Sequence, residues 1–322
     1  MKSVIETKEL TRVFDSTEGV LLKKKRKIVA VDHVTFTVRE GELFGLLGPN
    51  GAGKTTTIKM LTTLLVPTEG DAYVHGWHVV KEAQKIRSHI NVIFGGERGL
   101  YLRLSGKDNL RYFSDLYGVP AAIQKERIPE LLQLVGLKEH AEKKVENYSR
   151  GMKQRLHIAR GLINDPSLIF MDEPTIGLDP EGARSLRTII KELASQGKTI
   201  FLTTHYMFEA DELCDRIALL KEGKIITIDT PKSFKRELSD MTVIEMEGHN
   251  IPKDLIDTLK AHRHVKMVTM SQQDMNQIVQ IQTVPSTEAV MEILQELHTV
   301  KLSNIRIREP TLEDAYIKLM QG

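Results

Sequence analysis

The most specific chemical pattern in the chain is the sequence GPNGAGKTT at residues 48–56. It fits G-x-x-x-x-G-K-[ST], a loop that surrounds nucleotide phosphates with backbone N–H groups. Lys54 is expected to reach the β- and γ-phosphates, and the Thr55 hydroxyl to hold Mg²⁺. The pattern predicts that the chain binds a nucleoside triphosphate. The residues expected to contact it are Gly48, Asn50, Gly51, Gly53, Lys54, Thr55 and Thr56.

A second chemical element is the acidic pair Asp172 and Glu173, which follows the apolar run Leu168–Met171. The run predicts a buried strand, and ligands of open α/β sheets bind at the carboxyl ends of such strands. Asp172 is expected to bind Mg²⁺, directly or through water, and Glu173 to orient and deprotonate an attacking water. An acidic pair that ends a strand can also be a solvated turn, but its position after a phosphate loop favours the chemical interpretation.

The phosphate loop needs a strand before it and a helix after it. Leu43–Leu47 is apolar throughout and predicts a buried parallel strand, and residues 57–61 open a helix. The N-terminus of that helix presents the positive end of its dipole to the phosphates. Strand-like and helix-like segments then alternate as far as residue 220, which predicts a parallel sheet covered by helices.

Between the two phosphate elements lies the sequence YSRGMKQR at residues 148–155, and with it the chain resembles the ATP-binding cassette (ABC) family. The family signature often has the sequence Leu-Ser-Gly-Gly-Gln. Its serine and second glycine are present as Ser149 and Gly151, whereas Arg150 and Met152 replace the first glycine and the glutamine. The resemblance implies that Ser149 grips the γ-phosphate of ATP held by a neighbouring subunit. A serine that caps a helix is the ordinary structural alternative.

Other family motifs stand in the expected order and cover residues 1 to about 235. Gly177–Asp179 resembles the loop that links two active sites across a dimer, so Asp179 is an expected contact. His205, after an apolar strand, resembles the histidine that contacts the γ-phosphate, although a lone histidine there can be a polar cap. Phe14 stands where the family places an aromatic ring that stacks on adenine, and a core phenylalanine is the alternative.

One segment departs from the family pattern. Residues 92–101 have no glutamine where the family usually has one that contacts Mg²⁺ and signals to the membrane partner. Gly96 is expected to take this position, and Glu97 is a candidate replacement. The following residues, 98–101, still resemble the surface that receives the coupling helix of a transporter.

The expected fold is an α/β P-loop ABC cassette with an antiparallel β subdomain and a helical subdomain, followed by a small α+β domain. We assign residues 1–238 to the nucleotide-binding domain, with the helical subdomain at about residues 100–163. After residue 239 the pattern has the order βαββαβ, which is ferredoxin-like, and one more helix at 312–320.

Composition limits the class of protein. The chain has 322 residues, a net charge of +2 and one cysteine, Cys214, so no intrachain disulfide can form and a reducing compartment is favoured. Near-neutral charge argues against a nucleic-acid partner. No apolar run approaches the roughly 20 residues of a membrane span, and the N-terminus lacks an apolar signal segment. We therefore expect a cytoplasmic protein. The basic run Lys23–Lys27 is a solvated loop or a contact with anionic lipid headgroups.

The signature and the sequence PTLEDAY at residues 310–316 resemble one branch of the family, the ATPase subunits of ABC-2-type exporters for drug resistance and sodium efflux. The resemblance implies an ATP- and Mg²⁺-dependent motor at the inner face of the membrane. Two copies, or one copy and a relative, would sandwich two ATP molecules and drive a multi-span permease. A soluble ABC ATPase and a nucleotide sensor that scarcely hydrolyses ATP remain as alternatives.

Overall fold

The computed structural model describes residues 2–18, 24–95, 99–236, 241–273, 276–297 and 302–321. The chain divides into two compact units, Met1–Thr230 and Pro231–Gly322. The boundary expected at residues 238 and 239 falls outside the described residues. The second unit begins earlier because its first helix, α8 (Pro231–Arg236), packs against its last helix, α11 (Leu312–Gln321).

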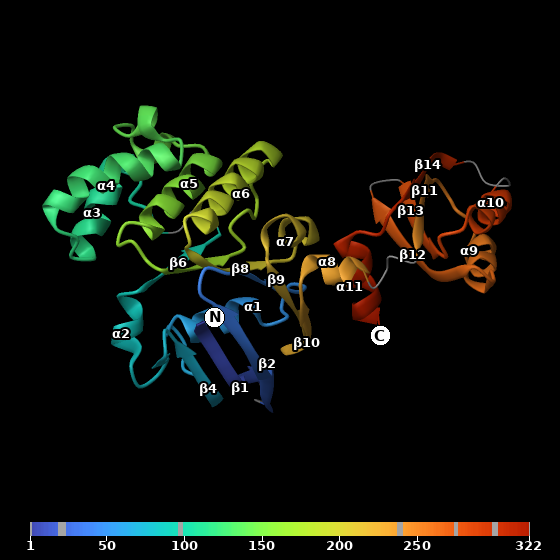
Figure 1. Cartoon of the computed structure of the whole chain (residues 1–322), viewed down its shortest axis with the longest axis horizontal. Coiled ribbons are helices and arrows are strands. Elements are labelled where there is room, and N and C mark those ends of the chain that lie inside the picture. The colour runs from blue at the N-terminus through green and yellow to red at the C-terminus, as the bar shows by residue number, and fades with distance from the viewer. Residues whose placement is uncertain are drawn as a thin grey trace. The chain divides into compact units, whose positions relative to one another are not determined.

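A six-stranded sheet forms the centre of the first unit (Figure 1). Its strands lie in the order β10 (Lys224–Asp229), β9 (Arg216–Lys221), β3 (Leu43–Leu47), β8 (Thr199–Thr204), β7 (Leu168–Asp172) and β6 (Ile90–Phe94). All neighbours are parallel except β9 and β10. Strands β3, β7 and β8 are buried along their whole length, as in a parallel sheet with both faces covered. The predicted parallel sheet is confirmed.

Helices connect these strands, and α3, α4 and α5 gather on one side of the sheet (Figure 1). The helices of the first unit are α1 (Lys54–Leu61), α2 (Ala83–Arg87), α3 (Gly106–Leu116), α4 (Ala121–Leu134), α5 (Arg150–Gly161), α6 (Pro180–Ser195) and α7 (Met207–Leu213). Short 3₁₀ turns at Lys138–His140 and Val145–Asn147 precede α5. Among the described helices of either unit, none combines the length and the apolar character that crossing a membrane requires.

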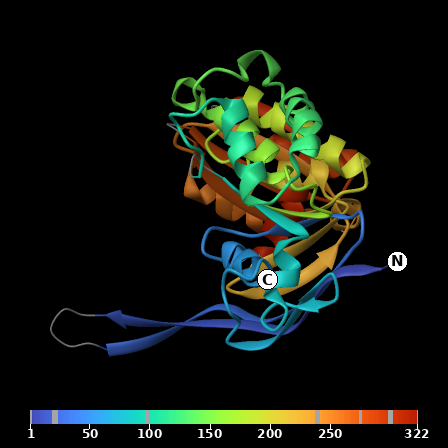
Figure 2. The same cartoon turned by 90° about the vertical axis from the view of Figure 1, so that its left-hand side faces the viewer.

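An antiparallel sheet lies on the other side of the first unit, and its strands β1 and β2 extend together as a long hairpin (Figure 2). The strand order is β2 (Lys24–Arg39), β1 (Ser3–Glu18), β4 (Glu69–Val74) and β5 (Trp77–His78). The sequence pattern predicts three short strands at residues 4–7, 28–31 and 34–38, and this is wrong, because the structure has two long strands here. Register shifts and the left-handed residues Glu9 and His33 let each strand continue through an irregular point.

The two sheets of the first unit share one hydrophobic core. A row of aromatic rings runs through it from β2 to β7. The ring of Phe36 lies 5.5 Å from that of Phe44, which lies 5.7 Å from that of Phe201. The ring of Phe170 follows at 5.6 Å from Phe201. These are ordinary separations for packed aromatic pairs, so the antiparallel sheet is fixed firmly on the parallel one.

The second unit contains the predicted order of strands and helices, β11-α9-β12-β13-α10-β14. Its elements are β11 (Thr242–Gly248), α9 (Lys253–Ala261), β12 (Val265–Gln273), β13 (Asn276–Thr283), α10 (Thr287–Glu296) and β14 (Leu302–Arg308). The strands form an antiparallel sheet in the order β12-β13-β11-β14. Alternate residues of β11 and β13 pack with the apolar faces of α9 and α10 in a core separate from that of the first unit.

Candidate active site

The phosphate loop lies between the end of β3 and the start of α1, at the carboxyl edge of the parallel sheet. Gly53 caps α1 with φ at 108°, and a Cβ on it would stand 2.3 Å from the carbonyl oxygen of Ala30. A Cβ on Gly48 would stand 2.3 Å from the carbonyl oxygen of Leu220. Both positions therefore need glycine, because neighbouring backbone leaves no room for a side chain.

Lys54 is almost fully buried, with 5% of its surface exposed. Its ammonium group donates to the carbonyl oxygens of Gly48, at 2.7 Å, and Pro49, at 3.1 Å. It also lies 3.0 Å from Oε1 of Glu173. A buried charge needs such partners, because its removal from water is costly. The lysine of the phosphate loop and the second residue of the acidic pair are thus in direct contact.

Asp172 ends β7 and is 8% exposed. Its Oδ2 accepts a hydrogen bond from Thr55 Oγ1 at 2.8 Å, and its Oδ1 accepts one from Thr203 Oγ1 at 2.5 Å. The two residues predicted to bind Mg²⁺ therefore touch each other. Protein sites for Mg²⁺ commonly supply one or two oxygen ligands and leave the rest to water and phosphates. Within the described segments, no group of three or more His, Cys, Asp or Glu residues could hold a metal ion. The Thr55–Asp172 pair fits a cation that arrives with a nucleotide.

Glu173 has a backbone conformation that is rare for residues other than glycine, with φ at 48°. Its N–H donates to the carbonyl oxygen of Thr203 at 3.0 Å, and its Oε2 lies 3.2 Å from His205 Nδ1. That histidine nitrogen has no well-aligned hydrogen bond, so the contact is a close approach rather than a directed bond. Strands β3, β7 and β8 thus bring Lys54, Glu173 and His205 together at their carboxyl ends.

Sequence reasoning missed Thr203 as a functional residue. Its side chain is fully buried, bonds Asp172 and lies 3.2 Å from the N–H of Glu173. The signal was the polar pair Thr203 and Thr204 at the end of an apolar strand. Its importance depends on β8 lying beside β7, which the linear pattern does not specify.

The remaining candidate residues from the signature and the linking loop line a pocket of about 510 Å³. Ser149 caps α5, since its Oγ accepts from the N–H of Met152 at 3.2 Å. Asp179 caps α6, since its Oδ1 accepts from the N–H of Gly182 at 3.0 Å. Gly151 and Arg150 lie in the same pocket. The N-termini of α5 and α6 therefore both line this polar pocket.

Phe14 lies on β1, where it pairs with Ile28 of β2, and its ring is partly exposed. The guanidinium carbon of Arg12 stands 4.6 Å from the centre of that ring. One face of Phe14 is therefore covered by a cation within the chain. Two other expectations, Gly96 and Glu97 in place of the glutamine, lie outside the described residues, as does Lys23 at the start of the basic run.

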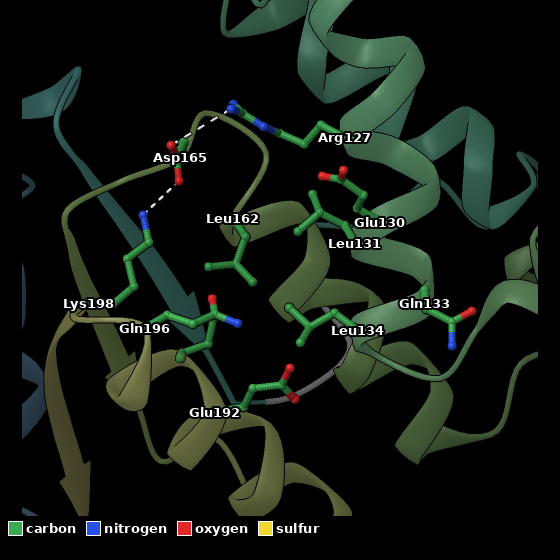
Figure 3. A pocket seen from close by; sticks show the side chains of 11 residues that line it. Arg127, Glu130, Leu131, Gln133, Leu134, Leu162, Asp165, Glu192, Gln196 and Lys198 are labelled. Carbon is green, nitrogen blue, oxygen red and sulfur yellow. Dashed lines mark hydrogen bonds and ion pairs between the residues drawn. The ribbon is translucent and has the colours of Figure 1, made fainter.

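A pocket of about 520 Å³ opens at the opposite edge of the sheet, where β7 and β8 begin (Figure 3). Figure 3 shows Asp165 between Arg127 and Lys198. The distance from Asp165 to Lys198 Nζ is 2.6 Å, and to Arg127 Nη2 it is 3.7 Å. The hydrogen bond from Lys198 holds the pKa of the Asp165 carboxyl below its usual value. The cations of this pocket are thus paired within the chain, and the pocket is remote from the phosphate loop.

Comparison with known proteins agrees with this geometry. Residues 31–176 match the family model described as ABC transporter. The chain is 34% identical over 295 residues to the linearmycin resistance ATP-binding protein LnrL of Bacillus subtilis (strain 168), covering 91% of this chain and 94% of that one. It is 35% identical over 309 residues to the doxorubicin resistance ATP-binding protein DrrA of Mycobacterium tuberculosis (strain ATCC 25618 / H37Rv), covering 92% and 89% of the two chains.

Solved structures are similar as well. A dimeric ATP-binding cassette in a post-hydrolysis state, bound to ADP and Pi, superposes with a TM-score of 0.62 at 28% sequence identity. The match covers 70% of this chain and 98% of that cassette.

Proposed function

Because the chain belongs to the ATP-binding subunits of ABC transporters, which bind ATP and hydrolyse it for transport, we propose that it powers efflux through a separate membrane permease. The observation that carries the ATPase assignment is the meeting of Lys54, Glu173 and His205 beside the Thr55–Asp172 pair. Two relatives are named for resistance to linearmycin and to doxorubicin. Efflux is a transport activity that produces resistance, and this supports export as the direction.

In this proposal the phosphate loop binds the nucleotide and Phe14 stacks on its adenine. Lys54 neutralises the β- and γ-phosphates, and His205 contacts the γ-phosphate. Glu173 accepts a proton from water while the water oxygen bonds to the γ-phosphorus. The bond from that phosphorus to the bridging oxygen breaks, and ADP leaves with the electron pair. Thr55 and Asp172 would hold Mg²⁺, which when bound neutralises charge on the phosphates.

We propose that two cassettes act as a dimer, in which each supplies residues to the ATP site of the other. Ser149, Gly151 and Asp179 line a hollow with two helix N-termini, which suits an anionic group. In the dimer this hollow faces the γ-phosphate held by the second cassette. The similarity to a dimeric cassette supports this arrangement.

The proposal also covers the second unit and the location. Along the chain, a helix follows β11 and another follows β13, and in the sheet the strands lie in the order β12-β13-β11-β14. This topology supports a ferredoxin-like fold. The permease would hold the chain at the inner face of the membrane.

A pull-down tests the proposal. The tagged variant Glu173→Gln should bind ATP, hydrolyse it slowly and accumulate as a dimer. It is incubated with ATP and detergent-solubilised native membranes. We expect it to recover a stoichiometric multi-span protein with ATP but not with ADP. Glu192→Gln, the same chemical change at an exposed position of α6, is the matched control and should turn over ATP at the rate of the unsubstituted chain.

Two outcomes contradict the proposal. Recovery with ribosomes or DNA-associated proteins and no membrane partner would indicate a soluble ABC ATPase. A turnover that is equally low in the unsubstituted chain and in Glu173→Gln would indicate a nucleotide sensor.

A further inference from the structure

Arg150 occupies the signature position that the family usually fills with glycine, and its side chain contacts Ile176 and Gly177, where the linking loop (residues 177–179) of the same chain begins. Its Nη2 donates to the carbonyl oxygen of Ile176 at 3.3 Å. Arg150 is the first residue of α5, directly after Ser149. The signature is therefore connected to the segment that follows the catalytic strand β7.

The linking loop is shaped around this guanidinium group. Gly177 has φ at 69°, and a Cβ on it would stand 2.1 Å from Nη2 and 2.3 Å from Cζ of Arg150. Glycine at this position thus serves both the turn and the close approach of the arginine. Arg150 is exposed, and its guanidinium group lies close against Gly177 at the protein surface.

A second hydrogen bond connects Ile176 to the backbone of Glu173. The N–H of Ile176 donates to the carbonyl oxygen of Glu173 at 3.2 Å. Ile176 therefore bonds Glu173 through its N–H and Arg150 through its carbonyl group. A change in the strained backbone of Glu173 moves Ile176 and, with it, the arginine next to Ser149. These contacts connect Glu173, the proposed base of one ATP site, to Ser149, which in the proposed dimer contacts the ATP of the other site.

We propose that Arg150 is a positioning residue that couples the two ATP sites of the dimer, so that the state of Glu173 in one site sets the grip of Ser149 on the other. The inference rests on the proposed dimer, in which Ser149 faces the nucleotide of the second copy. Ser149 and Gly151 keep the family's direct contact with phosphate. Arg150 adds a link inside each chain that a glycine at its position cannot provide.

The test compares Arg150→Gln with Arg111→Gln in the full chain. Arg111 is an exposed arginine of α3 and is not among the residues that line the pocket of Ser149 and Arg150. Mixed dimers are purified in which one copy carries Glu173→Gln. Where Arg150 is unsubstituted, the mixed dimer should turn over ATP at well below about half the rate of a dimer with two intact sites, since the sites are coupled. With Arg150→Gln in both copies it should retain about half, and the Hill coefficient for ATP should approach one. Arg111→Gln should match the unsubstituted chain, and Arg150→Lys should restore part of the coupling.

Three results would overturn the inference. They are unchanged coupling in Arg150→Gln, independent sites in the unsubstituted dimer, and loss of the ATP-dependent dimer in Arg150→Gln. Loss of the dimer would mean that Arg150 helps to bind the nucleotide of the second copy directly, rather than coupling the two sites. Failure of the proposed function would give a different result, because Glu173→Gln would then form no ATP-dependent dimer even with Arg150 intact.

Discussion

The hydroxyl group of Thr203 holds both acidic residues of the active site. It donates to Asp172, and it lies 3.2 Å from the N–H of Glu173, which also donates to the Thr203 carbonyl oxygen. A left-handed backbone costs a residue such as Glu173 about 1–2 kcal/mol. The bonds from Glu173 to Thr203 offset this strain, so one buried threonine determines where the proposed base points.

We therefore expect Thr203→Val to lower turnover by roughly ten- to a hundredfold, because small displacements of a catalytic group are costly. ATP affinity should change little, since Lys54 and the phosphate loop are untouched. The loss of a buried hydrogen bond should cost about 1–3 kcal/mol of stability. Steady-state kinetics and urea unfolding measure the two effects.

Thr199→Val is the matched control for this substitution. Thr199 starts the same strand, is buried, and accepts from the N–H of Gly41 at 2.9 Å. Its variant should lose stability and keep its turnover. Equal turnover in Thr203→Val and Thr199→Val would show that the hydroxyl has no part in positioning Glu173.

Among the elements, the last helix of the described chain, α11, is held at its start by an ion pair between the half-buried Arg308 and the buried Asp314. Arg308 of β14 donates to both carboxylate oxygens of Asp314, at 2.6 and 3.1 Å. The N–H and hydroxyl groups of Thr311 donate to the same carboxylate, at 2.6 and 2.8 Å. Burial raises the pKa of Asp314, but these hydrogen bonds lower it by more, so the net shift is downward. The sequence PTLEDAY, first noted as a branch resemblance, thus has a structural role as a helix start.

Asp314→Asn should destabilise the second unit by about 1–3 kcal/mol at neutral pH, because Arg308 loses its charged partner. Since the folded pKa is lowered, the contribution of the ionised carboxylate is present above the unfolded value of about 3.9. It is lost as the pH falls through the lower folded value. Hydrogen exchange of α11 and urea unfolding at several pH values should therefore show a gap between variant and unsubstituted chain that narrows below about pH 4.

Glu313→Gln is the control for Asp314→Asn. Glu313 is the exposed neighbour in the same first helical turn. Its substitution should leave the unfolding curve unchanged. A gap for Asp314→Asn that keeps its size below pH 4 would assign the effect to shape rather than to charge.

On the scale of the whole molecule, the proposed active site is completed only by a second copy. Ser149→Arg should leave nucleotide binding by the single chain within about threefold, because the phosphate loop is untouched, and should abolish the ATP-dependent dimer of a Glu173→Gln chain. Size-exclusion chromatography with ATP measures this. Ser286→Arg removes a matched helix cap in the second unit, at about 1 kcal/mol, and should leave the dimer intact. A dimer that persists in Ser149→Arg would contradict the role of Ser149 across the interface.

The sequence predicted the phosphate loop, the acidic pair and the parallel sheet, because each has a local signature: glycines around a lysine, carboxylates after an apolar run, and strands alternating with helices. It did not predict contacts that depend on which segments become neighbours. Thr203 matters because β8 lies beside β7, and Arg150 because α5 approaches the linking loop. The lengths of β1 and β2 were missed because irregular points at Glu9 and His33 interrupt the alternation without ending the strands.

The aromatic row from Phe36 to Phe170 has a consequence for thermal denaturation. Since the rings bridge both sheets of the first unit, neither sheet can separate from the other without exposing that core to water. The two sheets should therefore melt in one cooperative transition. Phe14 belongs to one sheet and Asp172 to the other, so heating should remove the proposed adenine contact and the proposed phosphate contacts together. The first unit then has no partly melted form that retains half of that site.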